Sequence, residues 1–120
     1  MKQTSMLQEK HCRACDAQTA AISEAESREW MAQLSPEWAL SGEHPFLVRE
    51  FRFKNFYQTI AFVNALAWIA HGEDHHPDLE VGYNRCKVQY HTHAINGLTE
   101  NDFICAAKID ALLPMLAREG

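Results

Sequence analysis

The sequence predicts an α+β fold, a four-stranded antiparallel sheet with helices packed on one face, with its elements in the order α-β-β-α-β-β-α. Three segments with helical periodicity each follow a residue pattern that is typical of a helix start. Two pairs of strand-like segments lie between them, and a short turn joins the members of each pair. Because short turns connect antiparallel neighbours, the two pairs predict one antiparallel sheet.

The first helix is expected to begin at Ser23, where "SEAE" matches a capping box. In this motif the Ser hydroxyl and the Glu carboxylate bond the free amides of a helix start. Trp30, Met31 and Leu34 then recur at three- and four-residue spacing, which marks a buried face. The helix is expected to end at about Leu34, because Pro36 disfavours a helical conformation at the residue before it.

A first hairpin is expected after this helix. "WAL", from Trp38, and "FLVREFRF", residues 46–53, have the composition of strands, and the turn-forming "SGEHP" separates them. In the second segment Phe51 and Phe53 alternate with charged residues, which is the period-two pattern of a half-buried strand.

The central core helix is expected over residues 56–72, "FYQTIAFVNALAWIAHG". Asn55 caps it, and Gln58 three residues later supports the cap. Gly72 is expected to end the helix. One apolar stripe should face the core, with a second set of residues widening it. The stripe is Ile60, Val63, Ala67 and Ala70, and the widening set is Phe62, Leu66 and Ile69.

The rest of the chain predicts a second hairpin and a last helix. The hairpin consists of "LEVGY" and "CKVQYHTH", which ends at His93. Asn84 and Arg85 form its connection, where Asn tolerates the positive φ that tight hairpin turns need. "TEND" at residues 99–102 resembles a capping box, and the apolar residues after it keep helical spacing until Pro114.

The composition is that of an ordinary single-domain globular protein. Of the 120 residues 47% are hydrophobic and 22% are charged, so a core can form without disulfides or metals. The net charge is −5 and the basic residues are scattered, so no nucleic-acid partner is expected. No apolar run is long enough for a signal segment or a membrane span, so we expect a cytoplasmic protein without membrane contact.

Residues 1–21 lack hydrophobic periodicity and are interpreted as a polar, loosely ordered N-terminal extension. They contain "HCRAC", in which Cys12 and Cys15 form a C-x-x-C pair. One such pair supplies half of a tetrahedral zinc site and no second pair follows, so metal or redox use is the less favoured alternative. Cys86 and Cys105 fall within apolar patterns and are expected to be small core residues.

Histidines gather in two places, "EDHHP" at residues 73–77 and "HTH" ending at His93. They can be ordinary surface residues, metal ligands or acid–base groups, because imidazole titrates near neutral pH and also binds metals. His71 and His75 have the i,i+4 spacing of zinc ligands, but no H-E-x-x-H order is present and the helix is expected to end between them. Alternatively, several imidazoles and a carboxylate converge on one neutral organic substrate. Spacing alone does not choose between metal and acid–base chemistry.

The histidine pattern resembles that of a known family. "DHHP" at residues 74–77, a tyrosine at Tyr83, "TH" at residues 92–93 and an aspartate at Asp102 are similar, in order and spacing, to the signature of the pterin-4a-carbinolamine dehydratases. "FKNF" and "GLTENDFI" also resemble the family, and "HCRAC" resembles a feature of its bacterial members. The resemblance covers roughly residues 23–113.

The resemblance implies a fold with the same element order and association into homodimers or homotetramers. It implies a reaction that removes water from a 4a-hydroxytetrahydropterin and gives the quinonoid dihydropterin, which is recycled during aromatic amino-acid hydroxylation. A proton must reach the departing 4a-hydroxyl, and another must leave ring N5. No metal and no redox cofactor are expected for this reaction.

By position, His75, His76 and His93 correspond to the family's three active-site histidines. The resemblance implies proton transfer around the 4a-hydroxyl by His75 and His93, and binding and polarisation of the pterin mainly by His76. Asp102 is expected to orient a histidine or to bind the pterin edge, in addition to capping its helix. His71 stands where many relatives carry a glutamate, so it is a candidate for substrate binding.

These expectations make residues 22–120 a pterin carbinolamine dehydratase-like domain and the protein a hydro-lyase, functionally coupled to an aromatic amino-acid hydroxylase. Its partners would be a pterin and further copies of itself. His91 is absent from the family pattern and is expected to share a strand face with His93 without a role in turnover. Two alternatives remain: a binding module that serves as dimerisation cofactor of a regulatory protein through its helix surface, and a zinc-binding protein that uses the histidines or "HCRAC".

Overall fold

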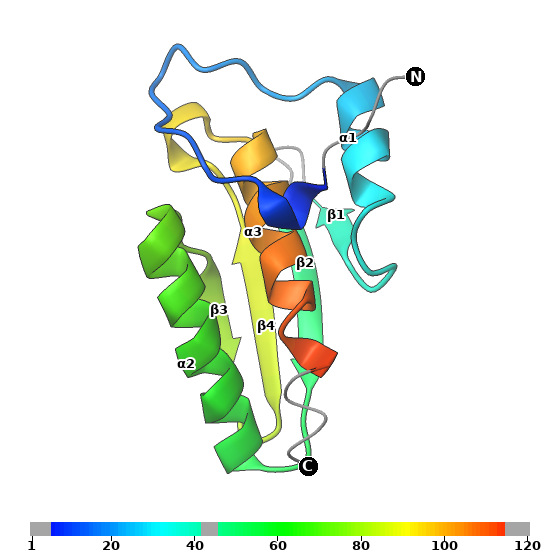
Figure 1. Ribbon diagram of the computed structural model, residues 1–120, viewed down its shortest axis with the longest axis vertical. Coiled ribbons are helices and arrows are strands. Elements are labelled where there is room, and N and C mark those ends of the chain that lie inside the picture. Colours follow the sequence, from blue (N-terminus) through cyan, green and yellow to red (C-terminus); the bar gives the residue numbers. More distant parts are fainter. Residues whose placement is uncertain (1–5, 42–45, 115–120) are drawn as a thin grey trace.

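The structure, a computed structural model, describes residues 6–41 and 46–114 of the chain (Figure 1). Its helices and strands follow the expected order α-β-β-α-β-β-α, with two short 3₁₀ helices added, so the predicted α+β fold class is confirmed. The elements are η1 (Leu7–Glu9), α1 (Glu24–Met31), β1 (Ala39–Ser41), β2 (Phe46–Arg52), α2 (Phe56–Glu73), β3 (Asp78–Val81), β4 (Arg85–Tyr90), η2 (His93–Ile95) and α3 (Glu100–Asp110).

The four strands form one antiparallel sheet in the order β1-β2-β4-β3. Cys86 of β4 lies opposite Phe51 of β2 on one side and Val81 of β3 on the other, which places β4 inside the sheet and β3 at its edge. Figure 1 shows α2 and α3 in front of the same side of the sheet. The sheet is therefore covered by helices on one face, as predicted.

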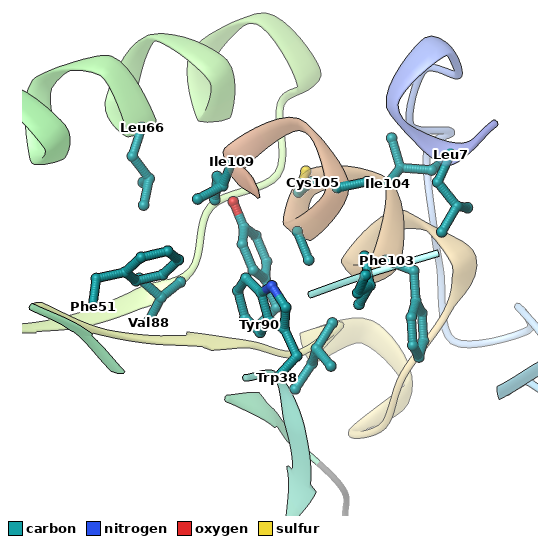
Figure 2. Packing of buried hydrophobic residues seen from close by; sticks show 14 of the residues in the cluster. Leu7, Trp38, Phe51, Leu66, Val88, Tyr90, Phe103, Ile104, Cys105 and Ile109 are labelled. Carbon is teal, nitrogen blue, oxygen red and sulfur yellow. The ribbon is translucent and has the colours of Figure 1, made fainter. Parts of the chain in front are cut away.

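The core fills the space between the sheet and the two long helices (Figure 2). Phe51 and Tyr90 point from the sheet toward the helices, because alternate residues of a strand face the same side. Phe62 of α2 is fully buried, and its ring centroid lies 4.5 Å from that of Phe51. Cys86 and Cys105 are also fully buried, which confirms that they are small core residues.

The central helix α2 differs from its prediction in two respects. It continues through Gly72, and the residue with left-handed backbone that follows its last turn is Asp74, at φ 51°. Its buried stripe is centred on Phe62 and Leu66, whereas Ala67 of the predicted stripe is exposed. The larger side chains face the sheet because they remove more apolar area from water than alanine does. Within the described residues, neither α2 nor any other helix is long and apolar enough to cross a membrane.

The connection between β3 and β4 is longer than the predicted two-residue turn. Residues 82–84 separate the strands, and the Gly82 N–H donates to the Arg85 carbonyl at 2.8 Å. Asn84 does not have the expected positive φ, since the described non-glycine residues with positive φ are Asp74 and Asn96. The prediction was wrong because a third loop residue relaxes the geometry that imposes positive φ on a two-residue turn.

Strand β4 ends at Tyr90 rather than at His93, so the "HTH" segment is not part of the strand. Thr92 and Gly97 pair in an isolated bridge, with the Thr92 N–H donating to the Gly97 carbonyl at 2.8 Å. Between them His93 begins η2, and Asn96 has a left-handed backbone at φ 49°. Asparagine tolerates this conformation, so the Asn-Gly pair folds the chain back and displays His93 on a short loop.

Over its described part, residues 6–21, the N-terminal extension is packed on the domain, in contrast with the loose arrangement that the sequence suggested. Leu7 of η1 is only 1% exposed and lies beside Ile104 of α3 (Figure 2). Its N–H donates to Gln33 Oε1 at 2.8 Å. In Figure 1 the extension, in blue, runs from the front of α3 to the region above the end of α2, and then crosses the top of the molecule to α1.

Replacing Phe62 with alanine should destabilise the protein by about 3–5 kcal/mol, because the ring is completely buried against Phe51 and Phe53 and its removal leaves a cavity. Urea unfolding followed by circular dichroism would measure the loss. Tyr57→Ala in the same helix is the matched control, since this side chain is 80% exposed and its loss should cost less than about 0.5 kcal/mol. Equal losses in the two variants would contradict the described core.

Candidate active site

A pocket of about 290 Å³ opens where the end of α2, the segment after β4, the start of α3 and the N-terminal extension meet. Four parts of the chain that are distant in sequence thus form one concave surface. Three of the histidines selected from the sequence are among the lining residues. The complete lining is Arg13, Ala14, Cys15, Asp74, His75, His76, Thr92, His93, Ala94 and Asn101.

His75 is held by a buried carboxylate. Nε2 of His75 lies 2.7 Å from Oδ1 of Asp102, whose side chain is completely inaccessible to solvent. Oδ2 of Asp102 accepts from the Thr92 hydroxyl at 2.8 Å and from the Thr99 N–H at 3.0 Å. Both carboxylate oxygens therefore have donors, as a buried charge requires. Asp102 caps the start of α3 and orients His75 at the same time.

Two opposing effects act on the pKa of His75. Burial disfavours the charged imidazolium and would lower the pKa, but the hydrogen bond and the negative charge of Asp102 outweigh burial and raise the pKa above its usual value. The ring also stacks on Tyr90, with centroids 5.6 Å apart and planes 14° from parallel. Because Nε2 donates to Asp102, Nδ1 is the nitrogen left for a ligand. A protonated His75 can thus offer an acidic N–H to the pocket.

His76 and His93 are the two exposed histidines of the pocket, and their ring centroids are 6.1 Å apart. His76 Nδ1 lies 3.3 Å from the Pro77 carbonyl, to which Nδ1–H donates, and this leaves Nε2 to accept a hydrogen bond. His93 comes from the loop between Thr92 and Gly97 rather than from the predicted strand. Within the described residues neither ring is paired with a carboxylate, in contrast with His75.

His91 lies beneath the site and does not line the pocket. It is buried, with 6% of its surface exposed, and its ring stacks on Phe46 with centroids 4.6 Å apart. Its centroid lies 5.2 Å from that of His93. The shared strand face expected for His91 and His93 is wrong, because the strand ends before both residues. His91 supports His93 from the protein interior.

His71 lies outside the pocket. It is exposed on α2, and its ring is tilted against that of Trp68 with centroids 5.8 Å apart. Asp74 takes the chain out of the helix before His75, so the two histidines do not share a helix face as i,i+4 metal ligands would. No three His, Cys, Asp or Glu side chains in the described part of the chain are grouped to hold a metal ion. The substrate-binding role of His71 stays a prediction.

The pocket contains residues that the sequence analysis did not assign to it. Arg13, Ala14 and Cys15 line it from the N-terminal extension, and Asn101 lines it from the first turn of α3. The sequence indicates Cys15 only as part of a C-x-x-C pair and singles out none of Arg13, Ala14 and Asn101. Their available signals were the "HCRAC" segment and the position of Asn101 directly before Asp102, and neither belongs to a periodic pattern that would predict a shared surface.

Comparison with known proteins gives the same family for most of the chain. Residues 20–112 match the family model described as pterin 4 alpha carbinolamine dehydratase. A protein of Legionella pneumophila (strain Corby), provisionally named pterin-4-alpha-carbinolamine dehydratase, is 56% identical over 110 residues, which cover 92% of this chain and 97% of the relative. A protein of Nitrosomonas eutropha (strain DSM 101675 / C91 / Nm57) with the same provisional name is 51% identical over 107 residues, covering 89% and 93%.

Two solved structures are also similar. One is a transcriptional coactivator/pterin dehydratase from Brucella melitensis, with a TM-score of 0.72, 33% identity, and coverage of 78% of this chain and 98% of that one. The other is a pterin dehydratase-like protein identified as a RuBisCO assembly factor in the alpha-carboxysome, with a TM-score of 0.57, 28% identity, and coverage of 63% and 88%. Proteins with this fold are thus described with catalytic and with non-catalytic roles.

Replacing Asp102 with asparagine should lower the pKa of His75. The substitution keeps the shape of the side chain but removes the negative charge and the strong acceptor that outweigh burial. NMR titration of the imidazole ring protons would measure the change. Lys54→Ala, at an exposed position that does not line the pocket, should leave the His75 midpoint unchanged and serves as the control. An unchanged or raised midpoint for His75 would contradict the assigned interaction.

The same pair predicts how stability depends on pH. A raised pKa in the folded state stabilises the fold fully below the unfolded value, about 6.5 for histidine, and this contribution disappears as the pH rises through the folded pKa of His75. The difference in unfolding free energy between the wild type and Asp102→Asn should therefore be larger at pH 6 than at pH 9. A difference that grows with pH would contradict the sign.

Proposed function

Because this chain belongs to the pterin-4α-carbinolamine dehydratase family, we propose that it catalyses the dehydration of 4a-hydroxytetrahydropterins to quinonoid dihydropterins. The observation that carries the proposal is the pocket in which His75, His76 and His93 meet, with His75 bonded to a buried carboxylate. The volume of the pocket, about 290 Å³, is at the lower end of the range for small-molecule sites, which suits a compact bicyclic ligand.

The reaction needs one proton donor and one proton acceptor. In the substrate, C4a carries a hydroxyl group and N5 carries a hydrogen. Protonation of the hydroxyl lets water leave with the electron pair of the C4a–O bond, and the pair of the broken N5–H bond forms the C4a–N5 double bond. Water is the only other product, so no electrons are gained or lost by the protein.

The surroundings of the three histidines support different roles. His75 suits the donor, because the bond to Asp102 raises its pKa and so favours the protonated ring, and its Nδ1 is left for the substrate. His93 suits the acceptor, because it is exposed in the pocket and no carboxylate among the described residues is bonded to its ring. His76 suits binding and polarisation of the pterin through Nε2, since its Nδ1 is used by Pro77. Each positioned acid or base typically contributes 10²–10⁴-fold to the rate.

Asp102 is proposed to act through His75 rather than by touching the pterin edge. Its carboxylate is fully buried, does not line the pocket and already accepts three hydrogen bonds. A positioning role therefore accounts for its contacts. For His71 a binding role would require the substrate, or a second copy of the chain, to reach beyond the pocket.

The chemistry of the substrate and the product also indicates which reactions come before and after this one. A 4a-hydroxytetrahydropterin arises when a pterin-dependent hydroxylase transfers one oxygen atom to its substrate, and the quinonoid product must be reduced before it is used again. We therefore place the protein in pterin recycling for aromatic amino-acid hydroxylation, in functional coupling to such a hydroxylase in the cytoplasm.

A second candidate function is a binding role without catalysis, as a dimerisation or assembly cofactor of another protein. The two similar solved structures are described as a coactivator and as an assembly factor, and these roles support a binding function as the second candidate. In this chain the relevant observation is the exposed aromatic surface of α2, where Tyr57 and Trp68 are 80% and 76% exposed. Tyr57 precedes Asp74, a lining residue of the pocket, by 17 residues, which is about 25 Å along a helix. Tyr57→Ala should therefore weaken such association without changing dehydratase turnover.

We expect a homo-oligomer under either function. The two edge strands, β1 and β3, have unpaired backbone groups on one side, and exposed edges and apolar side chains favour association with another copy. Multi-angle light scattering at micromolar concentration should give a mass that is a multiple of 13.7 kDa. A mass equal to that of one chain would refute this expectation.

Replacing His75 or His93 with alanine should lower turnover of freshly generated 4a-hydroxytetrahydropterin by about 10²-fold or more, as expected for loss of a positioned acid or base. His76→Ala should raise KM at least as much as it lowers kcat. Thermal unfolding of the His76 and His93 variants should shift little, since both side chains are exposed in the pocket. His75→Ala should unfold at a lower temperature, because it removes the donor to Oδ1 of the buried Asp102. Stopped-flow absorbance would follow the disappearance of the carbinolamine.

Lys54→Ala is the control for this series, because Lys54 is exposed just before α2, at the end of the helix opposite the pocket. His91 is unsuitable as a control, since it is buried against Phe46 and adjoins His93. Full activity of the folded His75→Ala and His93→Ala variants would exclude the proposed roles, and absence of wild-type activity would leave the binding function.

A further inference from the structure

Residues 10–15 of the N-terminal extension, here called the strap, border the pocket and are anchored to both long helices. At the end of α2, Oε1 of Glu73 accepts from the Cys12 N–H at 2.7 Å and Oε2 bonds His11 Nδ1 at 2.9 Å. Burial would raise the pKa of Glu73, but these hydrogen bonds outweigh burial and the pKa is lowered. At the start of α3, Lys10 pairs with Glu100. The strap therefore joins two elements that border the pocket.

Asn101 fixes the part of the strap that lines the pocket. It is almost completely buried, with 7% of its surface exposed. Its Oδ1 accepts from the Arg13 N–H at 3.0 Å, and its Nδ2 donates to the Arg13 carbonyl at 2.6 Å. One side-chain amide thus satisfies both backbone groups of Arg13, as a neighbouring β-strand would. The Arg13 side chain takes no part in this attachment and is therefore available to contact a ligand in the pocket.

The strap brings a positive charge to the pocket. Arg13 lines it and is exposed, and its guanidinium has no hydrogen-bond or ion-pair partner among the described residues. The lining also includes a carboxylate, that of Asp74, which belongs to the wall that carries His75 and His76. A guanidinium only donates hydrogen bonds and a carboxylate only accepts them. In the pocket, the Arg13 guanidinium therefore favours an acceptor group of a ligand, and the Asp74 carboxylate favours a donor group.

A pterin has complementary groups. Its N3–H and 2-amino group are donors, which suit the carboxylate of Asp74. Its acceptors are the C4 carbonyl, unprotonated ring nitrogens such as N1, and whatever oxygen atoms the substituent at C6 carries. Among acceptors, a guanidinium binds an anionic oxygen pair most strongly because two parallel charge-assisted hydrogen bonds form, and only the substituent at C6 can supply such a pair.

We propose that the strap is a wall of the pterin site and that Arg13 is a specificity-determining residue, which selects pterins with a negatively charged substituent at C6. The inference rests on the proposed function and deepens it, because it names the class of substrate. A carboxylate and a phosphate share the required chemistry. Asn101 is the positioning residue that keeps Arg13 at the pocket.

Binding of two unreactive pterins tests the proposal directly. Pterin-6-carboxylate has the anionic substituent, and 6-methylpterin has a neutral one of similar size. Fluorescence titration of the full-length wild type should give a Kd for pterin-6-carboxylate at least tenfold below that for 6-methylpterin. Arg13→Gln should bring the two values within about threefold, chiefly by weakening binding of the carboxylate. Raising the salt concentration should reduce the preference, because Arg13 is exposed.

Two further variants distinguish the effect of the Arg13 guanidinium from that of net charge and from that of its clamp, the two hydrogen bonds between Asn101 and the Arg13 backbone. Arg28→Gln removes the same charge from an exposed position of α1 that does not line the pocket, so it should keep the tenfold preference. Asn101→Ala leaves Arg13 present but removes its clamp, so it should lose most of the preference while circular dichroism shows a folded protein. Should Asn101→Ala unfold, Asn101→Ser provides the same test without adding a charge, because its single shorter hydroxyl cannot bond both backbone groups of Arg13.

Equal wild-type affinity for the two pterins would overturn the proposal, as would a tenfold preference that survives Arg13→Gln. The proposed function has a separate readout, namely wild-type turnover of the 4a-hydroxy form of a 6-methyl tetrahydropterin. Turnover without a preference between the two ligands would reject only the role of Arg13. A preference without turnover would reject the dehydratase function and leave an anionic-pterin site.

Discussion

The carboxylate of Asp102 has no contact with solvent, so its charge can persist only where hydrogen-bond donors surround it. Those donors come from three different segments: His75 after α2, Thr92 after β4, and the backbone of Thr99 at the start of α3. Satisfying one buried charge therefore fixes the relative positions of three segments that also form the pocket. The imidazole gains an orientation and a raised pKa from the same contact, so the structural and the chemical roles of Asp102 have a single physical origin.

Most of the fold could be predicted from the sequence because its elements carry strong periodic signals. The capping residues before α1, α2 and α3 and the alternation in β2 and β4 were sufficient for the order of the elements. The differences between prediction and structure occur where the backbone conformation of a single residue determines how the chain leaves an element or turns. Asp74 rather than Gly72 has the left-handed conformation after α2, and Asn96 rather than Asn84 has it in the second half of the chain. Periodicity does not report such positions, since several polar residues tolerate the conformation and tertiary contacts select among them.

The candidate site was predictable to the extent that it resembles a family signature. That signature selected His75, His76 and His93, and the fold brings all three to one pocket. The buried position of His91 could not be foreseen, because it follows from the end of β4 and the return of the chain at Asn96. The wall formed by the extension was missed for another reason. Its attachment depends on individual polar contacts such as that of Asn101 with Arg13, and these leave no repeating pattern in the sequence.

The anchors of the strap are next to the residues of the acid–base pair in the sequence. Glu73 precedes His75 by two residues, and Asn101 directly precedes Asp102. The strap and the hydrogen bond between His75 and Asp102 therefore join the same two helix ends, and each restrains the geometry that the other needs. The strap also lines one side of the pocket with Arg13, Ala14 and Cys15. An extension without hydrophobic periodicity thus contributes to the surface of the candidate site through polar contacts with the same two helix ends that hold His75 and Asp102.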